Sequence, residues 1–139
     1  MNISVWFLLI AVLIVGILIF VSILMTQKRG HVFNTAKYQS DWLKIENSLE
    51  KDNPATYNMA VVEADKLLDK ALREMGTSGN NMGERLKRSS GKFTQLNAVW
   101  HAHKLRNQIA HEHGFSVEYM QAKRALNSFR QALKDLGAI

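Results

Sequence analysis

The stretch KLRNQIAHEHG, residues 104–114, holds the side chains of this sequence whose types and spacing best suit chemistry. It places Arg106 and Asn107 a few residues before His111. Histidine transfers protons near neutral pH because its ordinary pKa is about 6.5. Arginine carries a permanent, forked charge that matches phosphate oxygens. Together these residue types suit acid–base cleavage of a phosphodiester without a metal ion.

These side chains belong to a helix that we expect from about residue 93 to residue 113, where Gly114 closes it. One side of this helix is an apolar seam that should face the core, formed by Ala98, Ala102, Leu105 and Ile109. The other side mixes large apolar and polar residues, namely Leu96, Val99, Trp100, His103, Asn107 and His111. A helix that is apolar on both sides is either central to its bundle or covered by a partner.

The spacing of Arg106 and His111 bears on how many copies of the chain form a site. Residues five apart on a regular helix point in directions about 140° apart, so a compact site within one chain would be awkward. Two copies facing each other across a two-fold axis would bring both pairs into one cleft. We therefore expect a homodimer whose interface includes Leu96, Val99 and Trp100.

Arg106-Asn107-x-x-x-His111, late in the penultimate helix of a small all-helical domain, resembles the R-x4-H motif of the HEPN superfamily, in which a polar residue follows the arginine. The resemblance covers residues 35–136. Many HEPN proteins are metal-independent endoribonucleases that act as dimers with both motifs in one site, and others only bind nucleotide or RNA. The resemblance implies catalytic roles for Arg106 and His111 and an orienting role for Asn107. Outside the motif, the candidate auxiliary residues are His103, Glu112 and His113.

Four histidines, at positions 101, 103, 111 and 113, also raise the question of a metal site. Histidines two residues apart point away from each other on a helix, and no cysteine accompanies them because the chain has none. We therefore expect no metal and no cofactor. The lack of cysteine also excludes disulfides and thiol catalysis.

The charge of the chain is confined to the part that follows Thr26, which carries all 18 Lys and Arg, all 12 Asp and Glu and the net charge of +6. A basic domain at a membrane has two polyanions within reach, the anionic lipid surface and nucleic acid. The candidate contacts to an RNA backbone lie in the glycine-rich segment 76–91 and on the last helix, and are Arg85, Lys87, Arg88, Lys123, Arg124, Arg130 and Lys134. The alternative for these residues is an ordinary solvated surface.

Residues 3–25, ISVWFLLIAVLIVGILIFVSILM, contain no charged side chain. At about 1.5 Å per residue they span a hydrocarbon core of about 30 Å. A cleaved signal peptide would have a basic start, a shorter apolar core and a small-residue cleavage site, and none of these is present. Because Lys28, Arg29 and Lys37 follow the run, the positive-inside rule predicts a single-pass protein of the cytoplasmic membrane, with its amino terminus outside and the remainder in the cytosol.

The rest of the chain shows helical periods and no strand alternation. We expect a helix from about Tyr38 to Leu49, a second capped by Asn53 and ended by Gly76, a short turn at residues 82–87, the helix of residues 93–113, and a last helix capped by Ser116. The predicted fold is all-α, with an N-terminal transmembrane helix followed by a four- to five-helix antiparallel, HEPN-like bundle. Residues 1–27 would be the anchor, 28–34 a juxtamembrane linker and 35–139 the cytosolic domain.

Three functional classes follow from these patterns. The first is a membrane-anchored, metal-independent endoribonuclease that acts as a homodimer with a composite site. The second is a non-catalytic module at the membrane that binds RNA, a nucleotide or a protein through the Trp100 side. The third is a structural bundle in which the motif has no task. The expected partners are RNA, the membrane through residues 3–25, a second copy of the chain and a regulatory protein.

Overall fold

The computed structural model describes residues 2–26 and 30–139, which contain helices and no strand. The elements are α1 (Ile3–Thr26), α2 (Thr35–Ser48), α3 (Ala55–Glu74), α4 (Met82–Arg88), the 3-10 turn η1 (Ser90–Lys92), α5 (Leu96–His111) and α6 (Tyr119–Asp135). The chain divides into two compact units, residues 1–31 and 32–139. Residues 27–29, which end the predicted anchor and begin the predicted linker, lie outside the described residues, and so do the charges of Lys28 and Arg29.

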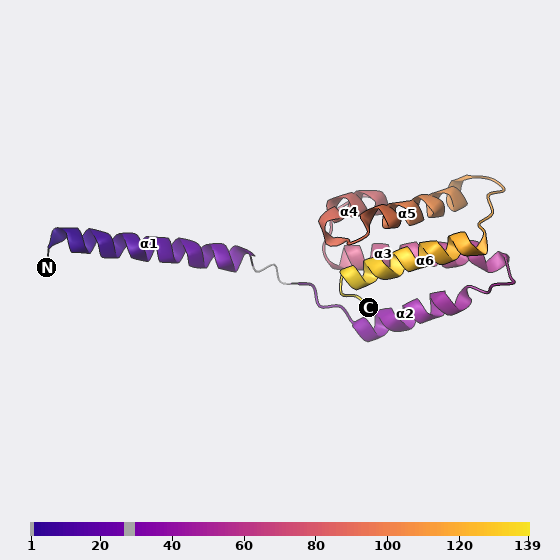
Figure 1. Cartoon of the computed structure of the whole chain (residues 1–139), viewed down its shortest axis with the longest axis horizontal. Helices are drawn as coiled ribbons and strands as arrows, with labels where there is room; N and C mark the ends of the chain where they lie inside the picture. The colour runs from indigo at the N-terminus through magenta and orange to yellow at the C-terminus, as the bar shows by residue number, and fades with distance from the viewer. Residues whose placement is uncertain (1, 27–29) are drawn as a thin grey trace. The chain divides into compact units, whose positions relative to one another are not determined.

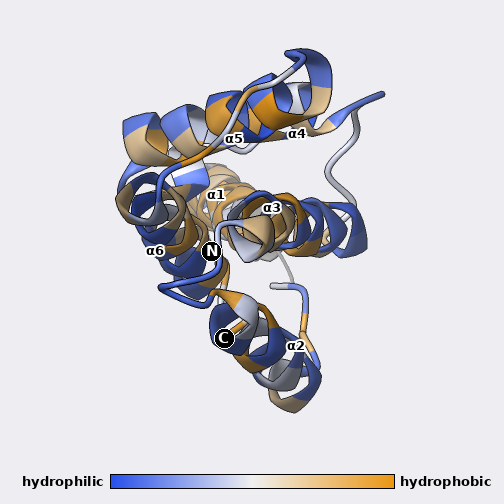
Figure 2. Ribbon diagram, turned by 90° about the vertical axis from the view of Figure 1, so that its right-hand side faces the viewer, coloured by the Kyte–Doolittle hydropathy of each residue, from blue (hydrophilic) through white to orange (hydrophobic). Residues whose placement is uncertain are grey.

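α1 is a helix of 24 residues without a charged side chain. Its segment Ile3–Ile23 is long and apolar enough to cross a membrane. In Figure 2 the visible part of α1 is coloured hydrophobic, whereas the helices of the second unit carry both hydrophilic and hydrophobic residues. The prediction of an apolar N-terminal helix of membrane-spanning length is therefore confirmed.

The second unit is a helical bundle in which α2, α3, α5 and α6 run successively in opposite directions (Figure 1). α3 is the central element, because it packs on α2, α4, α5 and α6, and α5 also packs on α6. The core joins apolar side chains from every helix of the unit and from Phe33, which lies in the predicted linker. Its largest fully buried apolar members are Tyr38, Val61, Leu68, Leu72, Leu86, Val99, Phe129 and Leu133. The prediction of an all-α chain is confirmed.

α3 and α6 correspond to two of the predicted helices, and each buries one apolar face. α3 also ends as predicted, at Gly76, whose φ of 76° lies in the left-handed region that favours glycine. The Gly76 amide donates to the Arg73 carbonyl at 2.9 Å, and the Thr77 amide donates to the Leu72 carbonyl at 3.0 Å. These bonds pair carbonyl groups at the helix end that would otherwise lack a partner.

Two of the predicted helix caps are wrong. The Asn53 side chain does not cap α3, because its Nδ2 donates to Glu50 Oε2 at 3.1 Å, and Pro54 occupies the cap position. Ser116 does not cap α6, because the cap residue lies two positions later at Glu118, which forms a capping box with Gln121. Asn and Ser at these points mark turns, but competing local hydrogen bonds decide which residue caps the helix.

α5 begins at Leu96 and not near residue 93, because η1 and the buried Phe93 precede it. Hydrogen bonds to Asp135 of α6 fix the position of the residues just before α5. The Thr94 amide and hydroxyl both donate to Asp135 Oδ2 at 2.8 Å, and Gln131 Nε2 donates to Asp135 Oδ1 at 2.9 Å. Burial alone would raise the pKa of Asp135, but these hydrogen bonds to the carboxylate together lower it. Their contribution to stability is present above the unfolded-state pKa of about 3.9 and is lost as the pH falls through the lower folded value.

A buried ion pair attaches α4 to α3. Arg85 Nε lies 2.6 Å from Asp69 Oδ1, and Arg85 NH2 donates to Asp69 Oδ2 at 3.1 Å. Arg73, one helical turn after Asp69, adds a third contact, since its NH2 lies 2.8 Å from Asp69 Oδ2. Arg85 is 8% exposed, so the prediction that it contacts an RNA backbone is corrected: its guanidinium is occupied within the fold.

This pair predicts a large loss of stability on removal of Asp69. Asp69→Ala leaves the buried Arg85 guanidinium without its carboxylate, and we expect the free energy of unfolding to fall by about 3–5 kcal/mol. The control is Glu63→Ala, which removes the exposed pair of Glu63 with Lys66 and should cost less than about 1 kcal/mol. Urea denaturation of the full chain in uncharged detergent, followed by circular dichroism, measures both. Equal losses in the two variants would contradict a structural role for the Asp69–Arg85 pair.

Candidate functional site

The candidate site begins with Asp65, a carboxylate on α3 that is only 3% exposed. Its Oδ1 lies 2.8 Å from His103 Nδ1, and its Oδ2 lies 3.4 Å from Arg106 Nε. The second contact is an ion pair without hydrogen-bond geometry. A buried carboxylate is tolerated only with partners of this kind, because an unpaired charge in the interior costs several kcal/mol. Asp65 therefore fixes two side chains of α5 at once.

His103 lies in the middle of a continuous polar chain. Its Nδ1 faces the Asp65 carboxylate, and its Nε2 lies 3.3 Å from Asn107 Nδ2. Asn107 Oδ1 in turn accepts from Arg106 NH1 at 3.2 Å. A carboxylate only accepts and an amide nitrogen only donates, so the network assigns the imidazole hydrogen to Nδ1 and leaves Nε2 as an acceptor. The chain runs Asp65, His103, Asn107, Arg106. Its hydrogen bonds are consistent in donor and acceptor, while Arg106 Nε contributes only the ion pair with Asp65.

These residues open onto a groove of about 660 Å³ between α3, α4 and α5. Its lining includes Arg106, Asn107 and His111 together with His103 and Asp65. Arg106 and His111 thus line one groove of a single chain, although their positions on the helix differ in direction. The two side chains that we expected to be awkwardly placed for a site within one chain thus share a groove, in which Arg106 is turned toward Asp65 on α3.

α4 covers the side of α5 that carries Trp100 and His103. A Cβ built on Gly83 would lie 3.7 Å from His103 Nε2 and 3.9 Å from Trp100 Cη2, so the α4 backbone passes close to both rings. The two rings also pack edge to face with their centroids 6.0 Å apart. Of the two explanations for a helix that is apolar on both sides, this contact fits a helix central to its bundle, because its second side packs in part against α4 of the same chain.

This arrangement changes the expected dimer surface. Val99 is 1% exposed and belongs to the core, so its assignment to an interface is corrected: a second copy has no access to it. Leu96 and Trp100 are half-buried and pack against the core. Trp100 also lines the groove.

The other predicted site residues are scattered. Glu112 and His113 are exposed beyond the last residue of α5 and do not line the groove. Lys87 and Arg88 are exposed on α4. On α6, Lys123 lies over the Tyr119 ring, Arg130 pairs with Glu46 at 3.4 Å, and Lys134 is exposed. These cations do not form one continuous track.

Arg124 differs from the other predicted cations of α6 because it lines a second groove, between α5 and α6. Lys104 and Asn107 line this second groove as well as the first. The one cation of the predicted α6 set that adjoins the candidate site is therefore Arg124.

Sequence reasoning missed Asp65, which holds the site together. The signal was an acidic residue inside the apolar stripe of α3, beside Ala64 and four residues before Asp69. A carboxylate in such a position is a buried group that needs partners. The sequence does not identify those partners, because they lie 38 and 41 residues away along the chain.

No group of three or more His, Asp or Glu side chains in residues 2–26 and 30–139 is positioned to hold a metal ion. No protein-family model, curated protein or solved structure matches this chain. The site is therefore interpreted from its own geometry.

The role of Asp65 predicts the effect of an isosteric change. Asp65→Asn keeps an oxygen that can accept from His103 Nδ1. On the side of Arg106, however, an uncharged amide group that donates replaces the carboxylate oxygen. We therefore expect the free energy of unfolding to fall by about 1.5–3 kcal/mol. The matched control is Asp41→Asn on α2, whose carboxylate pairs with Lys37 and Lys44 at the surface and should matter by less than about 1 kcal/mol. Guanidinium denaturation of the full chain measures both variants. An unchanged free energy of unfolding in Asp65→Asn would contradict the role of Asp65 in holding the site together.

Proposed function

We propose that this chain is a membrane-anchored, HEPN-like protein that cleaves RNA without a metal ion. The observation that supports this proposal is that Arg106, Asn107 and His111 line one groove, with Arg106 and Asn107 held in fixed positions by the Asp65 chain. Preorganised groups of this kind are what electrostatic stabilisation of a phosphoryl transition state requires. Lys104, exposed at the same groove, adds positive charge.

The reaction would be attack of a ribose 2′-hydroxyl on the neighbouring phosphorus. A base takes the hydroxyl proton, the bond from phosphorus to the 5′-oxygen breaks, and an acid protonates that leaving oxygen. Arg106 would bind the non-bridging oxygens of the phosphorane with its forked charge. His111, exposed at the end of α5, would transfer a proton.

Two proton transfers need two groups, and this requirement supports a homodimer. His103 is 7% exposed and both of its ring nitrogens face partners, so it is a positioning residue in this proposal. One chain then offers His111 alone as an accessible histidine of the groove. A second copy facing this groove would supply the second His111, one acting as base and the other as acid.

The apolar helix α1 would hold the protein at the membrane. α1 would cross the cytoplasmic membrane once, with the amino terminus outside and the bundle in the cytosol, where RNA lies. Confinement to the membrane raises the local concentration of a second copy and so favours pairing.

A second candidate is a non-catalytic module that binds RNA. The observation that favours it is the position of Asp65, whose carboxylate offsets part of the Arg106 charge. An arginine tied to a carboxylate can hold a phosphate while stabilising a phosphorane less strongly.

Cleavage of an RNA pool by the full chain in uncharged detergent, with EDTA present, tests the proposal. His111→Ala should abolish cleavage and leave affinity for an uncleavable 2′-O-methyl RNA nearly unchanged, because a neutral imidazole adds little to phosphate attraction. Arg106→Ala should reduce both. His113→Ala is the matched control, since His113 is exposed two residues away and outside the groove. Full activity of His111→Ala would contradict the proposed chemistry, and binding without cleavage would favour the second candidate.

The shared site is tested by mixing wild-type chain with His111→Ala. If each site needs two His111 side chains, random pairing of equal amounts should lower activity per wild-type chain to about half, and excess mutant should lower it further. Unchanged activity per wild-type chain would show that one chain suffices, and would remove the dimer while leaving cleavage in place.

A further inference from the structure

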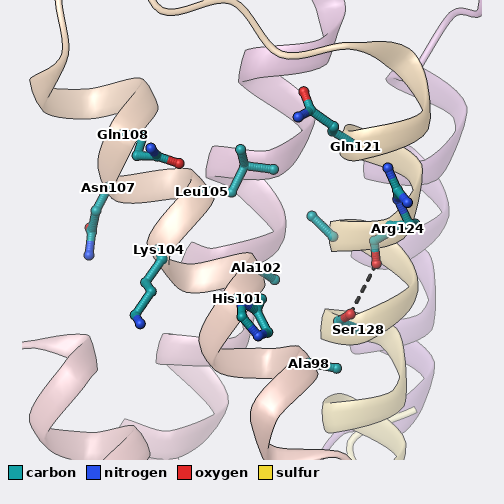
Figure 3. A pocket seen from close by; sticks show the side chains of 11 residues that line it. Ala98, His101, Ala102, Lys104, Leu105, Asn107, Gln108, Gln121, Arg124 and Ser128 are labelled. Carbon is teal, nitrogen blue, oxygen red and sulfur yellow. Dashed lines mark hydrogen bonds between the residues drawn. The ribbon is translucent and has the colours of Figure 1, made fainter.

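A second groove, of about 790 Å³, lies between α5 and α6 (Figure 3). Lys104 and Asn107 line both this groove and the groove that contains Arg106. In Figure 3 these two side chains point away from α6, whereas Leu105 lies between the two helices. The two grooves therefore adjoin along α5, with Lys104 and Asn107 as the ridge that they share.

Short side chains create this hollow. Ala98, Ala102 and Ala125 line it together with Leu105, so the helices leave space between them that larger residues would fill. The other lining residues are polar and are His101, Lys104, Asn107, Gln108, Gln121, Arg124 and Ser128. None of the residues that line this groove is acidic. A surface of cations and neutral polar groups without a carboxylate suits an anionic ligand.

The cations of this groove also make no ion pair. Most basic residues that line the other grooves of the described chain do make one. Within residues 2–26 and 30–139, no ion pair involves His101, Lys104 or Arg124. Arg124 makes one hydrogen bond, from its Nε to the Met120 carbonyl of its own helix at 3.3 Å. Its two terminal nitrogens are left for a ligand.

The groove between α2 and α3 provides the contrast. It also contains lysines, but Lys44 lies 3.7 Å from Asp41, and Lys66 lies 2.8 Å from Glu63. Charges that are already neutralised in this way attract a polyanion weakly. The concentration of unneutralised positive charge beside the candidate site is therefore a property of the α5–α6 groove.

We infer that the α5–α6 groove binds the sugar–phosphate backbone of the single-stranded RNA segment next to the phosphate held at Arg106. This inference rests on the proposed function and names how its substrate is bound. One strand crossing the ridge of Lys104 and Asn107 would fill both grooves, which favours RNA over an acidic protein. No aromatic ring lines the groove for base stacking except the imidazole of His101, so recognition falls on the backbone and is independent of sequence.

The test compares Arg124→Glu with Lys123→Glu in the full chain, in uncharged detergent. Both changes reverse one exposed charge on α6. Lys123, although predicted from the sequence to contact RNA, does not line the groove and lies over the Tyr119 ring instead. The probe is a fluorescent 2′-O-methyl oligonucleotide of about ten nucleotides, and anisotropy measures its affinity over a range of salt concentrations. Arg124→Glu should weaken binding at least about tenfold and lower the salt slope by about 0.7. Lys123→Glu should change affinity by no more than about twofold.

Equal effects of the two substitutions, or no binding by the wild-type chain, would overturn the inference. So would a larger effect of Arg124→Glu on binding of a polyglutamate peptide than on the oligonucleotide, which would assign the groove to an acidic protein. If binding depends on Arg124 but the chain never cleaves unmodified RNA, the inference about the groove is supported and the proposed nuclease activity is contradicted. If cleavage depends on His111 but the two α6 variants bind equally well, the inference about the groove is contradicted and the proposed nuclease activity is supported.

Discussion

The buried Asp65 carboxylate is the constraint on which the candidate site depends. It comes from α3, the helix on which every other helix of the bundle packs, so its position is set by the core itself. From there it holds His103 at 2.8 Å and Arg106 at 3.4 Å, both on α5. The interaction has a cost, because the Asp65 carboxylate and the His103 imidazole leave water and the Arg106 guanidinium does so in part. A bundle that needed only stability could use apolar residues here, which supports a functional reason for the polar chain.

A second carboxylate, one turn along α3, supports the same region in a different way. Asp69 binds Arg85 and thereby attaches α4, whose Gly83 lies against the rings of Trp100 and His103. One carboxylate thus orients the polar side chains of α5, and the next holds the short helix that covers them. The α3 residues at positions 65 and 69 therefore connect the core to both walls of the groove.

Local patterns in the sequence were sufficient to predict α1, the presence of α3 and α6, and the end of α3 at Gly76, because each depends on residues close together in the chain. They were not sufficient for α5. Helical periodicity placed Val99 and His103 on the side opposite the predicted core seam, but Val99 is buried in the core and α4 passes close to the His103 ring. A helix of seven residues is too short for its period to reveal its packing partner. The prediction for Arg85 was wrong because a buried arginine cannot be distinguished from a surface arginine in a segment this short. Asp65 required its distant partners, which no local pattern contains.

The most direct test of this account is the position of the ring hydrogen of His103. Two-bond nitrogen–proton NMR correlations of the full chain, labelled with ¹⁵N-histidine in uncharged micelles, give the tautomer at a pH where the imidazole is neutral, and His103→Gln assigns the signal. The account predicts a hydrogen fixed on Nδ1, directed at Asp65, with Nε2 as an acceptor toward Asn107. A hydrogen on Nε2, or exchange between the two nitrogens as in a solvent-exposed histidine, would contradict it.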